Sequence, residues 1–136
     1  MRFLFWTLFL AYIALILCVT LIFFRGAPYG SAELNPIAGY IRAAAAPPRL
    51  AHIEIRNIIL NILMFVPLGF FIPFLWHGLS KFYLVLSISL AFTLTIEIIQ
   101  LITARGVFSV EDILHNALGA IIGYFIYAAW PPQIFP

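Results

Sequence analysis

The chain has 136 residues, of which 65% are hydrophobic and 9% are charged, and its formal net charge is +2. A soluble domain has roughly 25% charged residues, so this composition excludes an ordinary soluble protein and indicates lipid as the main solvent. The basic residues are spread along the chain and form no patch, which excludes a nucleic-acid-binding surface. A single cysteine, Cys18, cannot form an internal disulfide.

Four apolar runs lie at residues 4–24, 58–76, 82–102 and 113–130. Each is about 20 residues long, which is the length that a helix needs to cross the hydrocarbon core. The runs lack the alternation of barrel strands, and only helices and closed barrels satisfy their backbone in lipid. We therefore predict an all-α membrane protein, with a single domain over residues 1–136. It is a bundle of four transmembrane helices with a long loop between helices 1 and 2.

The first run has an alternative interpretation as a signal peptide, because Arg2 provides a basic start. Its apolar stretch is longer than the roughly 7–15 residues typical of that signal. Phe23-Phe24-Arg25 also offers no small-residue cleavage site. We expect a retained helix.

The connection between the first two runs is rich in glycine and proline, which interrupt regular structure. Within it, a short helix is predicted over residues 36–46. Ile37, Tyr40 and Ile41 would share one face of this helix, and its alanines are good helix formers. Such a helix can lie along the membrane surface.

Polar residues inside membrane helices are rare and usually face the bundle interior or a wet cavity. Here they occur three or four residues apart, so each pair shares a helix face. The second run starts where the third ends and the fourth starts, so all the pairs should lie near one membrane surface. The predicted site consists of Arg56, Asn57, Asn61, Glu97, Gln100, Arg105, Asp112 and Asn116.

Within this set, Glu97 and Asp112 are the predicted catalytic pair, and the other six residues are predicted to bind substrate. An acid such as Glu97 inside a membrane helix should be protonated or paired, and Arg105 or Arg56 is the expected partner. The two arginines would hold a phosphate. A structural alternative also fits, in which Asp112 and Asn57 cap helices and the amides join helices by hydrogen bonds.

No metal site is predicted, because His52, His77 and His115 are isolated at different depths. Nothing in the sequence indicates a nucleotide or redox cofactor. Gly119 and Gly123 form a small-xxx-small face, which predicts close packing of a neighbouring helix. The same face could support a homo-oligomer.

Short motifs follow one another between residues 34 and 124. They are Leu34-Asn35-Pro36-Ile37, Asn57-Ile-Ile-Leu-Asn61, Phe65-Val-Pro-Leu-Gly69, Glu97-Ile-Ile-Gln100, Arg105, Glu111-Asp112, Asn116, Gly119 and Gly123. In the order and spacing of these motifs, the chain resembles the VanZ-like family of bacterial integral membrane proteins. The first motif looks like a shortened form of a loop motif of that family.

The resemblance implies a four-helix protein of the bacterial cytoplasmic membrane, with cytoplasmic termini and polar residues toward the outer face. The basic residues alone indicate the opposite orientation, because five arginines lie on the polar side against Arg2 and Lys81 on the other. The family's namesake is associated with resistance to the glycopeptide teicoplanin. No settled reaction accompanies it.

Two classes of function fit these residues. The first is an enzyme that acts on a lipid-linked or phospholipid headgroup, in envelope modification or glycopeptide resistance. The alternative is a non-catalytic lipid-binding or accessory membrane protein. In both, the expected partner is a membrane lipid or lipid-linked substrate. A transporter would require an oligomer, because four helices per chain are few.

Overall fold

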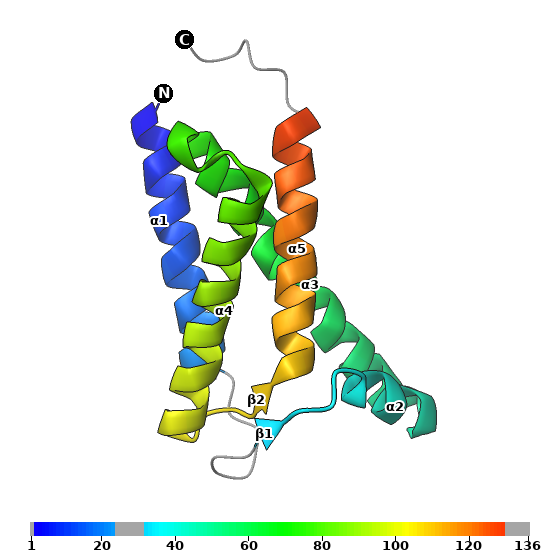
Figure 1. Ribbon diagram of the computed structural model, residues 1–136. Coiled ribbons are helices and arrows are strands. Elements are labelled where there is room, and N and C mark those ends of the chain that lie inside the picture. The colour runs from blue at the N-terminus through cyan, green and yellow to red at the C-terminus, as the bar shows by residue number, and fades with distance from the viewer. Residues whose placement is uncertain (1, 24–31, 130–136) are drawn as a thin grey trace.

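The computed structural model describes residues 2–23 and 32–129 (Figure 1). Four helices are long and apolar enough to cross a membrane, and they cover Phe3–Leu21, Pro48–Leu75, Phe82–Thr103 and Val110–Ala129. The predicted all-α fold with four transmembrane helices is confirmed, and the chain is a multi-pass membrane protein. The long loop predicted between the first two helices lies partly outside the described residues.

Long helices are joined by short connections that contain the smaller elements. In chain order they are α1 (Arg2–Cys18), the π-helix η1 (Val19–Phe23), β1 (Ala32–Glu33), α2 (Ala38–Ala45), α3 (Pro48–Leu75), the 3₁₀ turn η2 (His77–Leu79), α4 (Phe82–Thr103), β2 (Phe108–Ser109) and α5 (Val110–Ala129). The short helix predicted over residues 36–46 is α2. It ends at Ala46, whose extended backbone suits a residue before proline.

Helix α3 begins ten residues before the predicted run at 58–76, because polar side chains in its first turns conceal its start from a hydropathy reading. Pro48 occupies the first turn, where its missing N–H costs no hydrogen bond. Asn57 therefore lies inside the helix, and the interpretation of Asn57 as an N-cap is wrong. A helix of this length exceeds the membrane core, and α3 runs obliquely, with α2 beside its first turns (Figure 1).

A two-stranded parallel sheet joins segments that lie far apart in the sequence. Ala32 pairs with Phe108, and Glu33 pairs with Ser109. The pairing fixes the chain before α2 against the connection between α4 and α5. The sequence patterns did not indicate these strands, each of which is only two residues long.

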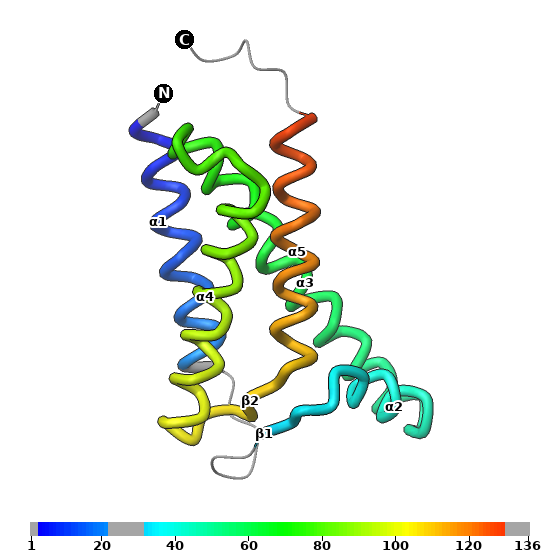
Figure 2. The backbone as a smooth tube through the Cα atoms, in the orientation of Figure 1, coloured from blue at the N-terminus to red at the C-terminus, as the bar shows by residue number. Residues whose placement is uncertain are grey.

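The helices define two ends of the bundle, which can be followed along the chain in Figure 2. At the lower end lie η1, the end of α4 and the start of α5, together with α2 and the sheet. We call it the polar end. At the upper end, which we call the aromatic end, Trp76 packs against Trp6 and Phe9 with ring centroids 4.6 and 5.5 Å apart.

Glycines allow α3 and α5 to pack backbone to backbone between these ends. A Cβ on Gly119 would lie 2.1 Å from the Ile62 carbonyl oxygen, and one on Gly123 would lie 1.9 Å from that of Val66. The predicted close packing of the glycine face is therefore formed inside one molecule. Helix α3 covers this face within one chain.

Candidate functional site

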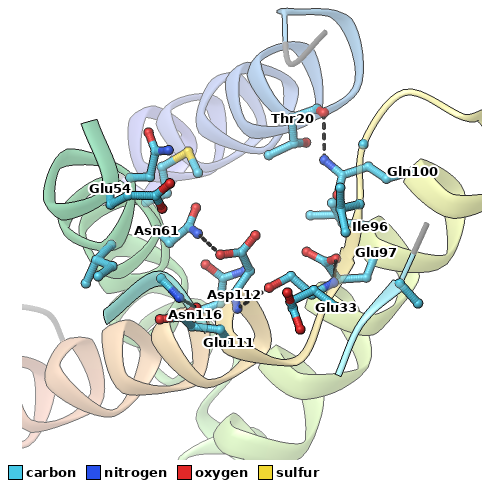
Figure 3. A pocket seen from close by; sticks show the side chains of 18 of the residues that line it. Thr20, Glu33, Glu54, Asn61, Ile96, Glu97, Gln100, Glu111, Asp112 and Asn116 are labelled. Atoms are coloured by element: carbon cyan, nitrogen blue, oxygen red, sulfur yellow. Dashed lines mark hydrogen bonds between the residues drawn. The ribbon is translucent and has the colours of Figure 1, made fainter. Parts of the chain in front are cut away.

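A cavity of about 520 Å³ opens at the polar end of the bundle (Figure 3). This volume is within the range of small-molecule sites, which lies at roughly 300–1,000 Å³. Side chains from η1, the sheet and helices α2 to α5 line it. The predicted site residues among them are Asn57, Asn61, Glu97, Gln100, Asp112 and Asn116.

The two arginines of the predicted site do not line this cavity. Arg56 is exposed on the outer side of α3. Arg105 is also exposed, and its Nη1 donates to the Leu21 carbonyl oxygen at 3.3 Å. Sequence spacing placed both at the correct end of the bundle but could not show which way each side chain turns.

Asp112 joins α5 to α3 at the wall of the cavity. The Asn61 amide donates from Nδ2 to Asp112 Oδ1 at 2.7 Å (Figure 3). The cap of α5 is Ser109, whose Oγ accepts the Asp112 backbone N–H at 3.1 Å. The interpretation of Asp112 as the capping group is therefore wrong, and its carboxyl group faces Asn61.

Glu97 is 3% exposed, and its carboxyl group holds the connection that precedes α5. Glu97 Oε2 accepts the Ser109 backbone N–H at 2.8 Å. The arginine partner expected for Glu97 is thus replaced by a backbone donor. Ser109 therefore contacts both predicted catalytic residues, because its N–H donates to the Glu97 carboxyl group and its Oγ accepts the Asp112 backbone N–H.

The remaining amides connect α4 to its neighbours. Asn116 Nδ2 donates to the Thr93 hydroxyl at 2.7 Å, which links α5 to α4. Gln100 Nε2 donates at 2.9 Å to the carbonyl oxygen of Thr20 (Figure 3). Thr20 lies in the π-helix η1, and π-turns occur frequently at functional sites.

The cation that the structure brings to the cavity is Arg42, which sequence analysis did not select. Its guanidinium lies 3.4 Å from Glu33 Oε2 and 3.3 Å from Glu54 Oε1. These three residues come from α2, β1 and α3. The pattern of α2 predicted a helix, but only the fold-back of α2 onto α3 places Arg42 beside the cavity.

All the acidic residues of the chain line this one cavity. The sequence contains five, and they are Glu33, Glu54, Glu97, Glu111 and Asp112. They do not converge on one point, because the described residues contain no group of three or more acidic, histidine or cysteine side chains that could hold a metal ion. Their gathering at one end of a chain with so few charges is the clearest mark of the site.

Glu111 holds the start of α2. Its Oε2 accepts the Gly39 N–H at 2.5 Å, although Glu111 belongs to α5. A Cβ on residue 39 would lie 2.9 Å from both carboxyl oxygens, so glycine is needed there for the close approach. One turn along α5, His115 Nε2 lies 2.9 Å from the Tyr40 hydroxyl oxygen and adds a second contact to α2.

Two buried atoms that belong to cavity-lining residues have no hydrogen-bond partner among the described residues. They are Glu111 Oε1 and Asn116 Oδ1, and their residues are 3% and 5% exposed. Buried polar atoms in folded proteins are nearly always paired. Unpaired acceptors in a cavity wall therefore indicate where a ligand can bind.

Comparison with family models gives a match over nearly the whole chain. Residues 9–131 match the model of the VanZ/LLP1 family. No curated protein and no solved structure matches the chain significantly.

Proposed function

Because the chain belongs to the VanZ/LLP1 family, we propose that its polar cavity binds the headgroup of a phospholipid or lipid-linked molecule and that the protein modifies this headgroup. One observation carries the proposal. Two carboxyl groups, those of Glu97 and Asp112, line one cavity inside a bundle of membrane-spanning helices. Acids inside membrane helices are rare and usually functional.

The surroundings of the cavity favour a lipid over a soluble substrate. Exposed aliphatic side chains cover the outer faces of the helices that form it, among them Ile59 and Leu63 on α3 and Ile98 on α4. These side chains lie within a few residues of Asn61 and Glu97. A headgroup can therefore reach the cavity while its acyl chains stay in the bilayer.

Each cavity side chain has a role in this proposal. Glu97 and Asp112 act as the acid–base pair, and Ser109 and Asn61 hold them in position. Arg42 is the cation for a phosphate, in place of the arginines that spacing had suggested. Three amides orient the headgroup, and they belong to Asn57, Gln100 and Asn116.

The proposal extends to orientation and physiology. We place the polar end at the outer face of the bacterial cytoplasmic membrane and the termini in the cytoplasm. Changed headgroups would alter the surface that glycopeptide antibiotics meet, so a role in teicoplanin resistance or envelope modification follows. Single cysteines at Arg49 and Lys81 in a Cys18→Ala background test the orientation. An impermeant maleimide should label only the first on intact cells, and labelling of only the second would reverse the topology.

The enzymatic proposal is tested on the lipids of cells. Extracts from deletion cells carrying the wild type, Glu97→Gln, Asp112→Asn or Thr95→Val are compared by mass spectrometry. Thr95 is the matched control, because it is exposed on α4 two residues from Glu97 and its hydroxyl bonds to its own helix. We expect one lipid class to change on deletion and to be restored by the wild type and Thr95→Val only.

The hydrogen bonds of the two carboxyl groups also favour a second function, in which the cavity recognises a lipid without converting it. A lipid-binding or accessory protein predicts unchanged lipid profiles in all strains. It also predicts that a lipid copurifies with the wild type and less with Asp112→Asn. Identical profiles from strains with equal protein levels would therefore reject the enzyme and leave the binder.

A further inference from the structure

Three of the four amide side chains that line the cavity already donate one N–H each to a protein acceptor. Asn61 Nδ2 donates to Asp112, Asn116 Nδ2 to Thr93, and Gln100 Nε2 to a carbonyl of η1. The Arg42 guanidinium is shared between two carboxylates. These amides therefore have only part of their donor capacity left for a ligand.

The two buried cavity atoms that lack a hydrogen-bond partner among the described residues are both acceptors. Glu111 Oε1 and Asn116 Oδ1 belong to side chains that are at least nine-tenths buried and line the cavity from α5. They lie five residues apart, which places them on different sides of α5, so they are two separate acceptor positions. An acceptor without a donor costs free energy when it is buried, and a ligand that supplies N–H groups would remove this cost.

The charge of the wall agrees with the hydrogen-bond pattern. Among the described residues that line the cavity, five carboxyl groups face the one guanidinium of Arg42. Two of the five, Glu33 and Glu54, are next to Arg42 at its exposed side. The other three have no cation partner among the ion pairs of the described residues. An uncompensated carboxylate is costly to bury, so a positive ligand fits this part of the wall better than a negative one.

Resting on the proposed function, we infer that the cavity recognises an ammonium group, so that its substrate class is an amine-bearing lipid headgroup. The ammonium lies in the part of the wall that Glu97, Glu111 and Asp112 form. A phosphate of the same headgroup would lie toward Arg42. A primary ammonium supplies three donors and a positive charge, which matches both the unpaired acceptors and the surplus of carboxyl groups.

A hydroxyl-rich headgroup satisfies only half of these observations. A hydroxyl can donate to an unpaired acceptor, but it brings no charge to balance the carboxylates. A purely anionic headgroup satisfies neither, because its oxygens are acceptors. The ammonium is therefore the group that both observations favour.

The test compares a lipid that carries an ammonium with one whose ammonium is acetylated and with one that has a glycerol headgroup. Purified full-length protein in detergent is titrated with phosphatidylethanolamine, N-acetyl-phosphatidylethanolamine and phosphatidylglycerol of equal chain length, and binding is measured by native mass spectrometry. N-acetylation removes the positive charge but keeps the phosphate and the acyl chains. We expect phosphatidylethanolamine to bind about tenfold or more tightly than the other two.

Two variants relate this preference to the proposed atoms. Glu111→Gln removes one carboxylate while keeping the acceptor for the Gly39 N–H, and it should lower the preference several-fold. No acidic residue can serve as the control, because all of them line the cavity. Lys81→Gln is used instead, because it removes an exposed charge at the other end of the bundle. It should leave the preference unchanged.

The outcomes distinguish a lipid from a soluble source of the ammonium. They also distinguish failure of the ammonium inference from failure of the proposed function. Glycerophosphoethanolamine and Mg²⁺ are titrated as competitors. Displacement of the lipid by glycerophosphoethanolamine would assign the cavity to a soluble amine, and displacement by Mg²⁺ would assign it to a metal ion; either result would overturn the lipid headgroup as the ligand. Equal binding of the three lipids, or tighter binding of phosphatidylglycerol, would overturn the ammonium inference and leave headgroup binding intact. Binding of no lipid would count against the proposed function itself.

Discussion

The two ends of the bundle are built from different chemistry on the same helices. At the aromatic end, Phe9 packs against Phe71 and Trp76 with centroids 5.9 and 5.5 Å apart. At the polar end, η1, α3 and α4 present Thr20, Asn61 and Glu97 to a cavity. One end is therefore filled by side chains, and the other leaves room for a ligand.

The comparison teaches where stability and function lie in this chain. Rings fill the aromatic end without needing specific partners, which suits a structural anchor. Each buried polar side chain of the polar end depends on a partner from another element, so that end is held by single hydrogen bonds. The glycine contact between α3 and α5 lies between the ends and supports both.

The largest effect is expected from breaking the contact that both ends share. Gly123→Leu would place its Cβ 1.9 Å from the Val66 carbonyl oxygen, so α3 and α5 must separate. We expect the free energy of unfolding to fall by more than about 4 kcal/mol and the variant to give little monodisperse protein in detergent. Gly78→Leu is the control, since nothing lies within 4 Å of the corresponding Cβ. Equal yields of the two variants would contradict the close packing.

A smaller effect should be confined to the aromatic end. Phe9→Ala removes a buried ring and is expected to cost about 3 kcal/mol of unfolding free energy, measured by denaturant titration in detergent. Lipid binding at the cavity should persist in the protein that remains folded. Phe3→Ala is the matched control, because Phe3 is 85% exposed. A loss of headgroup binding by folded Phe9→Ala protein would show that the ends are not independent.

At the polar end, one hydroxyl distinguishes a cavity contact from a surface contact. Thr93→Val leaves the Asn116 amide without its acceptor and should cost about 1–3 kcal/mol, with weaker lipid binding. Thr95→Val makes the same change on the exposed face of α4 and should change neither quantity by more than a few tenths of a kcal/mol. Indistinguishable variants would argue against a buried Asn116–Thr93 bond.

The smallest effect concerns the turn that leads from α4 toward the cavity. Ala104 has φ 52°, in the left-handed region that favours glycine. Ala104→Gly should therefore raise the unfolding free energy by up to about 1 kcal/mol, measured in the same titration. Ala91→Gly, inside the same helix, should lower it by about that amount. A destabilised Ala104→Gly protein would contradict the assigned turn.

The four spans and most of the polar end could be predicted from the sequence, because length, hydropathy and helical spacing determine them. Six of the eight predicted site residues line the cavity for this reason. The direction in which each side chain leaves its helix and the packing of α2 back onto α3 could not be predicted. Spacing cannot show that Arg56 turns outward or that α2 returns Arg42 to the cavity, and two-residue strands leave no pattern to read.

The capping roles failed for a related reason. Asn57 and Asp112 stand where apolar runs begin, which resembles a helix start. The helices instead begin at Pro48 and Val110, because polar turns can be helical when other elements satisfy them. The sequence analysis names Glu111 only as part of a short motif, since its bond to Gly39 depends on tertiary contact.

The central claim is that a lipid headgroup occupies the polar cavity. A phospholipid with a photoreactive diazirine on its headgroup, crosslinked to the protein in bilayers and mapped by peptide mass spectrometry, tests it most directly. We predict labels on peptides around Asn61, Gln100 and Asp112 that unlabelled lipid competes away, with no such saturable labelling around Phe71. Labels of equal intensity at both ends, or labels that excess lipid does not remove, would contradict the claim.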